Sequence, residues 1–105
     1  MKRRPYAKIK SVKIDGVIWL RPVVDKLATK HGVETFEVEE TLNKRPKIRR
    51  IEKGKREGED VYMALGQTDA GRYLTILFID KGNGEVLPLS ARDMADKERR
   101  RYGRK

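Results

Sequence analysis

Val61-Tyr-Met-Ala-Leu-Gly66 opens the part of the sequence that decides the fold. The turn Thr68-Asp-Ala-Gly71 joins this apolar run to a longer one, Arg72-Tyr-Leu-Thr-Ile-Leu-Phe-Ile79. A second turn, Lys81-Gly-Asn-Gly84, leads to a third run, Glu85-Val-Leu-Pro-Leu-Ser-Ala91. Short apolar runs bounded by turns of this composition are typical of hairpin-connected strands. The stretch therefore predicts an antiparallel meander, whose almost uniformly apolar central strand should be buried on both faces.

The residues ahead of the meander predict a hairpin and a helix. Asp15-Gly16 lies between two apolar runs, which is a signal for a two-residue hairpin turn. Apolar residues recur at helical spacing after Pro22, and proline suits the first turn of a helix. His31-Gly32 is the expected end of this helix, because glycine readily takes the left-handed conformation that terminates one.

Three further elements are expected around the meander. Residues 34–43 predict a second, shorter helix, although Phe36 alternates with glutamates as it would in a strand. Lys47-Ile-Arg-Arg-Ile51 fits a strand with one apolar face, and a short basic helix should end near Tyr102. Trp19 and Phe36 are expected to lie in the core.

A chain of 105 residues suits one domain. The predicted fold class is α+β: a small single domain over residues 11–105, built on a central antiparallel sheet. The helices of its N-terminal half should pack on one side of the sheet, and a short helix should follow the last strand. Residues 1–10 are predicted to form a flexible basic arm.

Positive charge is concentrated in three blocks of the sequence. The formal net charge is +10. Residues 1–13 carry six basic and no acidic residues, residues 44–57 eight and two, and residues 92–105 seven and three, whereas residues 14–43 and 58–91 are each net −3. Clustered positive charge predicts binding to a polyanion such as nucleic acid. The plainer alternative is that these lysines and arginines only keep the protein soluble.

The composition excludes several kinds of site. The chain has no cysteine and one histidine, which excludes disulfides, thiol catalysis and metal sites built from thiolates or several histidines. It has no glycine-rich phosphate loop, no nucleophile-elbow serine and no carboxylate cluster suited to magnesium. No apolar run approaches the roughly 18 residues of a membrane span, and no hydrophobic signal region follows the basic start, so a cytoplasmic protein is expected. No metal or other cofactor is predicted.

Arg92 is the first candidate for a functional residue. It follows the third apolar run directly, so it should be held at the end of a strand, and arginine can grip a phosphate through two parallel N–H groups. Its alternative is a surface arginine paired with Asp93 or Asp96. Arg72, at the start of the central run, could add to the same positive surface or merely shield a strand end.

Glu98, Tyr102, His31 and Lys30 are the candidates for proton transfer. Glu98 and Tyr102 are four residues apart and share a face of the expected helix. Their alternatives are a carboxylate that caps the helix and a phenol that packs on the sheet edge. His31 could be a general base, or a favourable cation at the end of its helix.

Five further cations are candidates for RNA binding: Lys30, which precedes His31, and four residues of the basic blocks, Lys97, Arg99, Arg49 and Arg50. Arg99, Arg100 and Arg101 fan around a helix at about 100° per residue, so they cannot all face one ligand. If the protein cuts nucleic acid, RNA is the natural substrate, since its 2′-hydroxyl can attack the adjacent phosphate without a metal ion. DNA offers no such internal nucleophile.

Five short motifs, in this order and spacing, resemble the BrnT family of toxins within the RelE/ParE-like superfamily. The resemblance covers residues 19–102 and is carried by Lys30-His-Gly-Val33, Tyr62-Met-Ala-Leu-Gly66, Asp69-Ala-Gly-Arg72, Ser90-Ala-Arg92 and Glu98-Arg-Arg-Arg-Tyr102. It implies a RelE-like α+β fold with a central antiparallel sheet. It also implies a metal-independent endoribonuclease that inhibits translation by cutting mRNA and is held inactive by a co-expressed antitoxin protein. Arg92 and Arg72 fall on positions of the family pattern, so both are expected to meet in one open groove and to bind the scissile phosphate there.

The sequence also departs from the family pattern. Leu20, Val23 and Leu27 stand where the family usually has aspartate, lysine and asparagine, and Gln67 stands where it commonly has arginine. Ala95 replaces a threonine that caps the last helix, so Asp93 is expected to cap it instead. The alternative function is a non-catalytic basic module that binds nucleic acid, for which the three charged blocks suffice without an active site.

Overall fold

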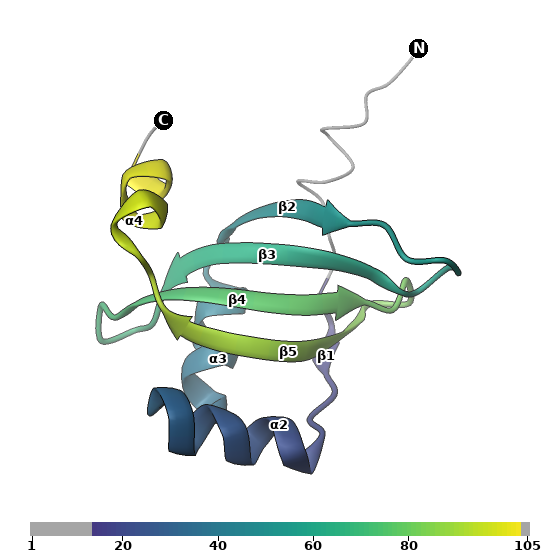
Figure 1. Ribbon diagram of the computed structural model, residues 1–105, viewed down its shortest axis with the longest axis horizontal. Coiled ribbons are helices and arrows are strands. Elements are labelled where there is room, and N and C mark those ends of the chain that lie inside the picture. The colour runs from purple at the N-terminus through teal and green to yellow at the C-terminus, as the bar shows by residue number, and fades with distance from the viewer. Residues whose placement is uncertain (1–13, 104–105) are drawn as a thin grey trace.

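A five-stranded sheet forms the centre of the molecule (Figure 1). The computed structural model describes residues 14–103. The strands lie in the order β1-β5-β4-β3-β2, and their bounds are β1 (Gly16–Val17), β2 (Lys47–Glu52), β3 (Asp60–Gln67), β4 (Tyr73–Asp80) and β5 (Glu85–Asp93). The helices are α2 (Arg21–Lys26), which continues into the π-helical turn η1 (Leu27–His31), then α3 (Thr35–Asn43) and α4 (Asp96–Gly103). The α+β class predicted from the sequence is confirmed. The predicted basic arm lies outside the described residues.

The meander β3-β4-β5 is antiparallel throughout, as predicted. The central strand, β4, buries Leu74, Ile76 and Phe78 completely on one side, against the helices of the N-terminal half. On its other side only Thr75 is buried, while Leu77 and its neighbours on that side are half-buried. The prediction that this strand is buried on both faces is therefore wrong for much of its second face, because α4 covers only one end of it.

The N-terminal hairpin predicted at Asp15-Gly16 does not form. Gly16 instead belongs to β1, which runs parallel to β5 and pairs Gly16 with Glu85. A two-residue hairpin turn needs left-handed backbone at its glycine, and the φ angle of Gly16 is not positive. The backbone N–H of Asp15 donates to the carbonyl oxygen of Gly84 at 2.6 Å, so the segment is fixed by a partner distant in sequence.

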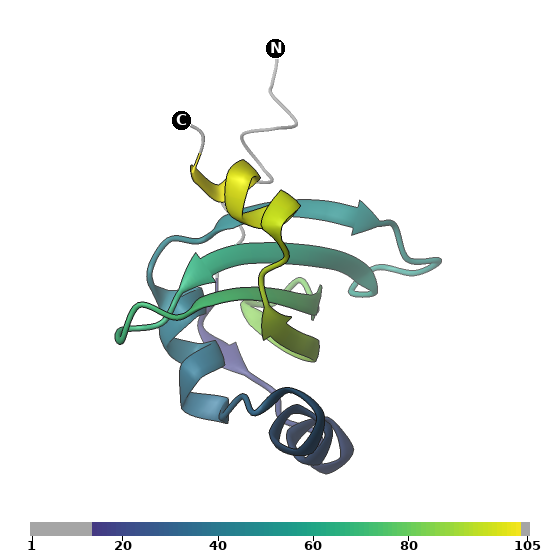
Figure 2. The same ribbon diagram turned by 60° about the vertical axis from the view of Figure 1, so that its left-hand side comes forward.

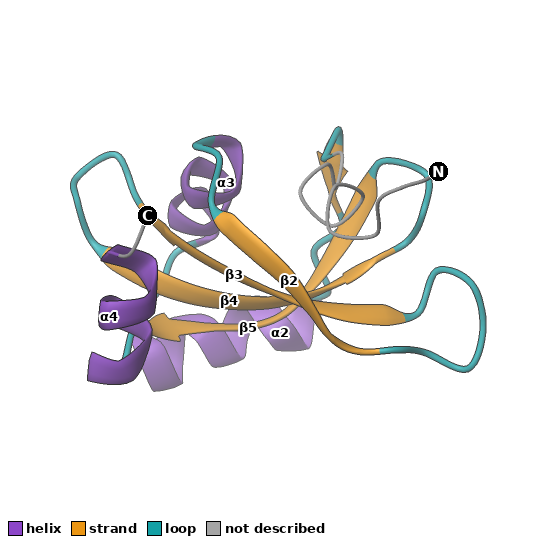
Figure 3. Cartoon of the chain, turned by 90° about the horizontal axis from the view of Figure 1, so that it is seen from above, coloured by secondary structure: helices purple, strands orange, loops and turns teal. Residues whose placement is uncertain are grey.

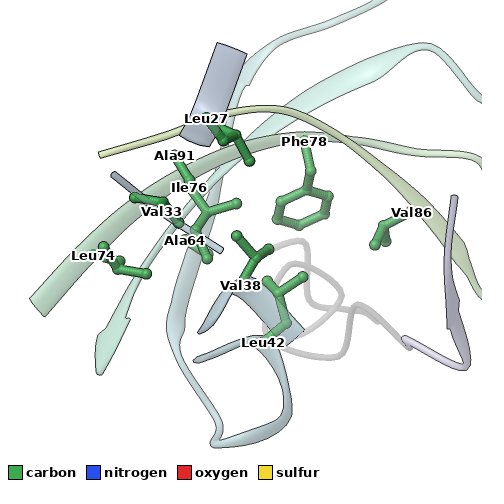
Figure 4. Close-up of a cluster of buried hydrophobic side chains, with 10 residues drawn as sticks. All are labelled: Leu27, Val33, Val38, Leu42, Ala64, Leu74, Ile76, Phe78, Val86 and Ala91. Atoms are coloured by element: carbon green, nitrogen blue, oxygen red, sulfur yellow. The ribbon is translucent and has the colours of Figure 1, made fainter. Parts of the chain in front are cut away.

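Two helices cover one face of the sheet, as expected, and pack on its core (Figure 4). Pro22 lies in the first turn of α2, and Gly32 ends the helical segment with a left-handed φ of 61°. Helix α3 starts with a capping box between Glu34 and Glu37, which settles the choice between helix and strand there. It approaches β3 so closely that a Cβ on Gly66 would lie 2.8 Å from a methyl group of Thr41.

The two aromatic residues expected in the core differ in their burial. Trp19 is half-buried against the core, and its indole N–H donates to Glu39 at 2.8 Å. Phe36 is 57% exposed, so its assignment to the core is wrong. It lies on the outward side of α3, while Val38 and Leu42 fill the inward side.

The helices are divided between the two faces of the sheet. Helices α2 and α3 lie on one side, and α4 crosses the other side near the end of β5 (Figures 2 and 3). We call these the core face and the α4 face. None of the helices within residues 14–103 is long and apolar enough to cross a membrane. The α4 face is only partly covered, and Arg92, Glu98 and Tyr102 lie on it.

Candidate nucleic-acid interface

A row of four residues runs across the α4 face beneath the last helix. The strand registers place Lys47 opposite Leu65, Leu65 opposite Thr75, and Thr75 opposite Arg92. Residues directly opposite one another on neighbouring strands point to the same face. The row therefore has a cation at each end and an apolar and a hydroxyl side chain between them.

Arg92 is held at its end of the row by Glu98 of α4. Its Nη1 and Nη2 each donate to a different carboxylate oxygen of Glu98, both at 2.8 Å. Nη1 also donates to the carbonyl oxygen of Asp93 at 3.1 Å. Two parallel bonds fix the plane of the guanidinium as well as its position. The sequence-based alternatives, in which Arg92 pairs with the carboxylate of Asp93 or Asp96, are wrong, because its ion pair is with Glu98.

Glu98 is a carboxylate that accepts hydrogen bonds from several groups of the protein. Besides Arg92, the hydroxyl of Thr75 and the backbone N–H of Ala95 donate to it, each at 2.8 Å. The hydrogen bonds from Arg92 are the main reason why the pKa of Glu98 falls from 4.5 to about 2, and those from Ala95 and Thr75 act in the same direction against the effect of burial. The bond from Ala95 also caps α4, so the capping role considered for Glu98 is confirmed. The expected cap, Asp93, pairs with Arg72 instead.

The side of the Arg92 guanidinium that carries Nε points away from this carboxylate. Glu98 takes the end-on pair of donors, Nη1 and Nη2. Within residues 14–103, no group accepts a hydrogen bond from Nε of Arg92 or a second one from its Nη2. These two N–H groups form the other parallel fork of a guanidinium. The Arg92 side chain is 44% exposed, and this fork has no acceptor among the described residues.

Two tyrosines and a second arginine extend the interface beside the row. The ring of Tyr102 packs edge-on against that of Tyr73, with centroids 5.9 Å apart. The guanidinium of Arg99 lies 3.7 Å from the centroid of Tyr73, and the ammonium of Lys47 lies 5.8 Å from that of Tyr102. The packing alternative considered for Tyr102 is thus realised, on the same face as Arg92.

A pocket of about 200 Å³ opens between α4 and the outer strands of the α4 face. Its lining residues come from β2, β3 and α4: Lys47, Ile48, Arg49, Met63, Leu65 and Arg101. A larger pocket, of about 540 Å³, lies at the opposite end of the sheet, between the loop after β2 and the turn after β4. The smaller pocket adjoins the row that ends in Arg92, and it is therefore the more relevant of the two.

Arg72 lies on the core face, where its nitrogens are taken up by the protein. Nε donates to Asp93 at 2.8 Å, Nη1 to the carbonyl oxygen of Gly32 at 2.9 Å and to Glu37 at 3.1 Å, and Nη2 to the carbonyl oxygen of His31 at 3.1 Å. The hydrogen bond with Arg72 is the main reason why the pKa of Asp93 is lowered, with a smaller contribution from the charge of His31. It likewise raises the pKa of Arg72. Arg72 therefore joins η1, α3 and the end of β5.

The structure divides the predicted site residues between the two faces. Arg92, Glu98, Tyr102, Arg99 and Arg49 lie on the α4 face. The side chains of Arg72 and Arg50 lie on the core face, Arg50 paired with Asp60 at 3.4 Å, and His31 contributes its carbonyl there. Lys30 and Lys97 are exposed, at the end of η1 and in the first turn of α4. The guanidinium groups of Arg72 and Arg92 thus do not meet in one groove, although both bond to Asp93.

Sequence reasoning missed four residues of this interface: Thr75, Tyr73, Lys47 and Arg101. Thr75 had a signal, because it is the polar residue inside the apolar run of the central strand. Tyr73 begins the same strand and is two residues away, so it shares the face of Thr75. Lys47 and Arg101 could be placed only once the register of β2 and the position of α4 were known.

Among residues 14–103, no group of three or more histidine, aspartate or glutamate side chains is placed to hold a metal ion. The metal-free reaction expected from the sequence stays a prediction. What the α4 face presents to a ligand is a set of cations and phenols.

Three comparisons with known proteins bear on the identity of the fold and site. The family model described as the ribonuclease toxin BrnT of type II toxin–antitoxin systems matches residues 24–98. The crystal structure of the Brucella abortus ribonuclease toxin BrnT superposes with a TM-score of 0.57 at 20% sequence identity, covering 77% of this chain and 97% of that one. That likeness shows a shared fold. A search among curated proteins finds no match.

Proposed function

Because the chain belongs to the BrnT family of ribonuclease toxins of type II toxin–antitoxin systems, we propose that it cleaves RNA on its α4 face by attack of a ribose 2′-hydroxyl on the adjacent phosphate, without a metal ion. A toxin of such a system has an antitoxin protein as its partner, and a ribonuclease has RNA as its substrate.

The fork of Arg92 carries the proposal. Glu98 takes the end-on donors of the guanidinium and leaves the side with Nε without a partner among the described residues, on a side chain that is 44% exposed. A phosphate can accept two parallel hydrogen bonds from that side while the pair with Glu98 stays intact. The arginine is thus preorganised, and no ion pair has to break before the substrate binds.

The cleavage step needs charge stabilisation and two proton transfers. The 2′-oxygen forms a bond to phosphorus and its proton leaves to a base, while the bond from phosphorus to the 5′-oxygen breaks and that oxygen takes a proton from an acid. The products are a 2′,3′-cyclic phosphate and a 5′-hydroxyl. Arg92 is placed to stabilise the extra negative charge on the phosphate oxygens in the transition state.

Tyr102 is the proposed proton donor, because it is the candidate phenol on the face of Arg92. Glu98, with a pKa of about 2, is a weak base, so its role is to position Arg92 rather than to move a proton. His31 and Lys30 stand at the end of η1, away from α4, so solvent water is the proposed acceptor of the 2′-hydroxyl proton. Arg72 acts indirectly, by holding Asp93, whose carbonyl oxygen accepts a hydrogen bond from Arg92.

The same face is the proposed docking site of the antitoxin. Arg49, Arg99 and Arg101 lie beside the row from Lys47 to Arg92, so an acidic or amphipathic helix of the antitoxin would complement the face and exclude RNA from it. The proposed substrate is mRNA, and the proposed place of action is therefore the cytoplasm, where mRNA is translated.

The chemistry of the products tests the proposal. Purified protein, free of antitoxin, is incubated with a defined single-stranded RNA in the presence of EDTA, and the new ends are identified by mass spectrometry. We expect 2′,3′-cyclic phosphate and 5′-hydroxyl ends, and no cut at a position that carries a 2′-O-methyl group. Binding that weakens with salt but yields no cleavage would instead support the non-catalytic module. Cleavage that stops in EDTA would contradict the metal-free mechanism.

A further inference from the structure

The pocket beside α4 has a rim of cations and an apolar floor. Arg49 and Arg101 stand on its rim, while Met63 and Leu65 supply apolar side chains to its lining. Leu65 is buried, and Met63 is half-buried. We infer that this pocket is a specificity site that takes one unpaired guanine of the RNA substrate. The inference rests on the proposed function, because it assigns a base to the same face that binds the scissile phosphate.

The rim offers hydrogen-bond donors that are not already in use. Within residues 14–103, neither the Arg49 nor the Arg101 guanidinium donates a hydrogen bond or takes part in an ion pair. Arginine has five N–H donors and no acceptor. A ligand that satisfies both groups must therefore present acceptors, and an edge with two neighbouring acceptors suits a guanidinium best.

Guanine has that edge, at O6 and N7, and it is the base to which arginine most often bonds through two parallel contacts. Adenine presents a donor, its N6 amino group, where guanine has O6, and cytosine presents its N4 amino group. Either would set N–H groups against N–H groups and leave buried donors without partners, which costs affinity. Uracil offers acceptors, but they are not adjacent, so it should rank second.

The floor favours a planar base over a phosphate. Met63 and Leu65 cannot replace the water that a phosphate loses on entering the pocket, whereas the flat face of a base gains by packing on them. The exposed fork of Arg92 is a better phosphate site, because no apolar side chain lies beneath it in the cross-strand row; its neighbour there is Thr75.

One RNA strand can reach both sites. The row from Lys47 to Arg92 crosses four adjacent strands, which is about 14 Å at the usual spacing of about 4.8 Å between strands. Lys47 also belongs to the pocket lining, and its ammonium donates to the carbonyl oxygen of Arg101 at 3.1 Å. A base in the pocket would therefore belong to a nucleotide close to the scissile phosphate, at a fixed distance from the cut.

The test compares base preference in cleavage and in binding. A pool of single-stranded RNAs with random sequence is cut by the full chain, and the new ends are sequenced. In parallel, oligo(A) strands with 2′-O-methyl groups, which cannot be cut, carry a single guanine, inosine, 7-deazaguanine or no replacement, and their binding is measured by fluorescence anisotropy. The variants are R49Q and R101Q. The matched control is R50Q, which removes the same charge from the next residue of β2 on the core face.

We expect guanine at one fixed position near the cut, at least about tenfold tighter binding of the guanine strand than of oligo(A), and most of that preference lost with 7-deazaguanine. R49Q and R101Q should each lower the preference several-fold, whereas R50Q should leave it unchanged. Equal weakening of all strands by R49Q and R101Q would mean that they bind phosphate, and would overturn the inference. Cleavage with no preferred base would overturn the guanine site but leave the proposed RNA cleavage standing. A guanine preference in binding without any cleavage would support the guanine site and contradict the proposed cleavage.

Discussion

Arg72 and Arg92 stand at the same end of the sheet, and both bond to Asp93, but they use their nitrogens differently. All three nitrogens of Arg72 donate to carboxylates or carbonyls of the protein. Arg92 donates with its end-on pair to Glu98 and with Nη1 also to a carbonyl oxygen, and no described residue accepts from its Nε. Two arginines at one end of the sheet can thus have unlike roles: one connects elements of the fold, and the other is held ready for a ligand.

Asp93 is the point at which the two networks meet. Its carboxylate accepts from Arg72 on the core face, and its carbonyl oxygen accepts from Arg92 on the α4 face. Leu74, its partner across the ladder, is fully buried, so the backbone at this end of β5 is firmly placed. Loosening of the core-face network should therefore reach Arg92 only through this backbone.

The largest effect is expected from a change that removes the fork of Arg92. Arg92→Ala should lower the cleavage rate roughly 10³-fold, as the loss of a donor to a transition-state oxyanion does. Arg92→Lys should lower it by about 10²-fold, because one ammonium cannot hold Glu98 and a phosphate through parallel pairs. The measurement is single-turnover cleavage of a defined RNA. If Arg92→Lys cleaves as fast as the natural protein, the fork has no special part in the reaction.

A smaller effect, and one of a different kind, is expected for Arg72. Arg72→Ala leaves the partly buried Glu37 and two carbonyl groups without their donor, so the free energy of unfolding should fall by about 3 kcal/mol. The cleavage rate of the folded variant should stay within a few-fold of normal. Urea unfolding and cleavage at low temperature measure the two quantities. A variant that folds as stably as the natural protein but does not cleave would reverse the comparison and make Arg72 the phosphate ligand.

The sequence predicts the turns and the helix ends well, because their causes are local. The turns of the meander, Pro22 at a helix start and Gly32 at a helix end act over a few residues, and all are found where the pattern predicts them. The hairpin at Asp15-Gly16 fails for the opposite reason. Its segment is held by β5, about seventy residues further along, and no local signal reports that pairing.

The two faces of the sheet explain what the sequence could not predict about the site. Arg72 and Arg92 look alike in the sequence, since each lies next to an apolar run, Arg72 at its start and Arg92 just after it. Only the register shows that Arg92 lies opposite Thr75 on the α4 face, while Arg72 turns toward η1 and α3. Phe36 was misplaced for a related reason: its hydrophobicity says nothing about which side of α3 meets the sheet.

Acid should weaken the ion pair between Arg92 and Glu98 on the α4 face. The pKa of Glu98 falls from 4.5 to about 2 in the folded protein, so its contribution to stability is complete above about pH 4.5 and is lost as the pH falls toward 2. That contribution should be roughly 2 kcal/mol, given that Arg92 is partly exposed. Urea unfolding of the natural protein and of Glu98→Gln as a function of pH measures it. The two curves should converge over this interval; a constant gap between them would mean that the ion pair does not stabilise the fold.

The smallest effect is expected at Thr75, where a substitution tests whether the Thr75 hydroxyl helps Arg92 to hold Glu98. Thr75→Val keeps the shape of this buried residue but removes the hydroxyl that donates to Glu98, so it should lower the free energy of unfolding by about 1 kcal/mol. Cleavage should fall only a few-fold, because Arg92 and Ala95 still hold the carboxylate. Thr75→Ser, which keeps the hydroxyl, is the matched control and should retain the fast rate. Hydrogen exchange of the α4 amides shows whether the Thr75 hydroxyl helps to hold the helix. Faster exchange in Thr75→Val alone would mean that it does, whereas equal exchange in both variants would mean that Arg92 holds α4 without it.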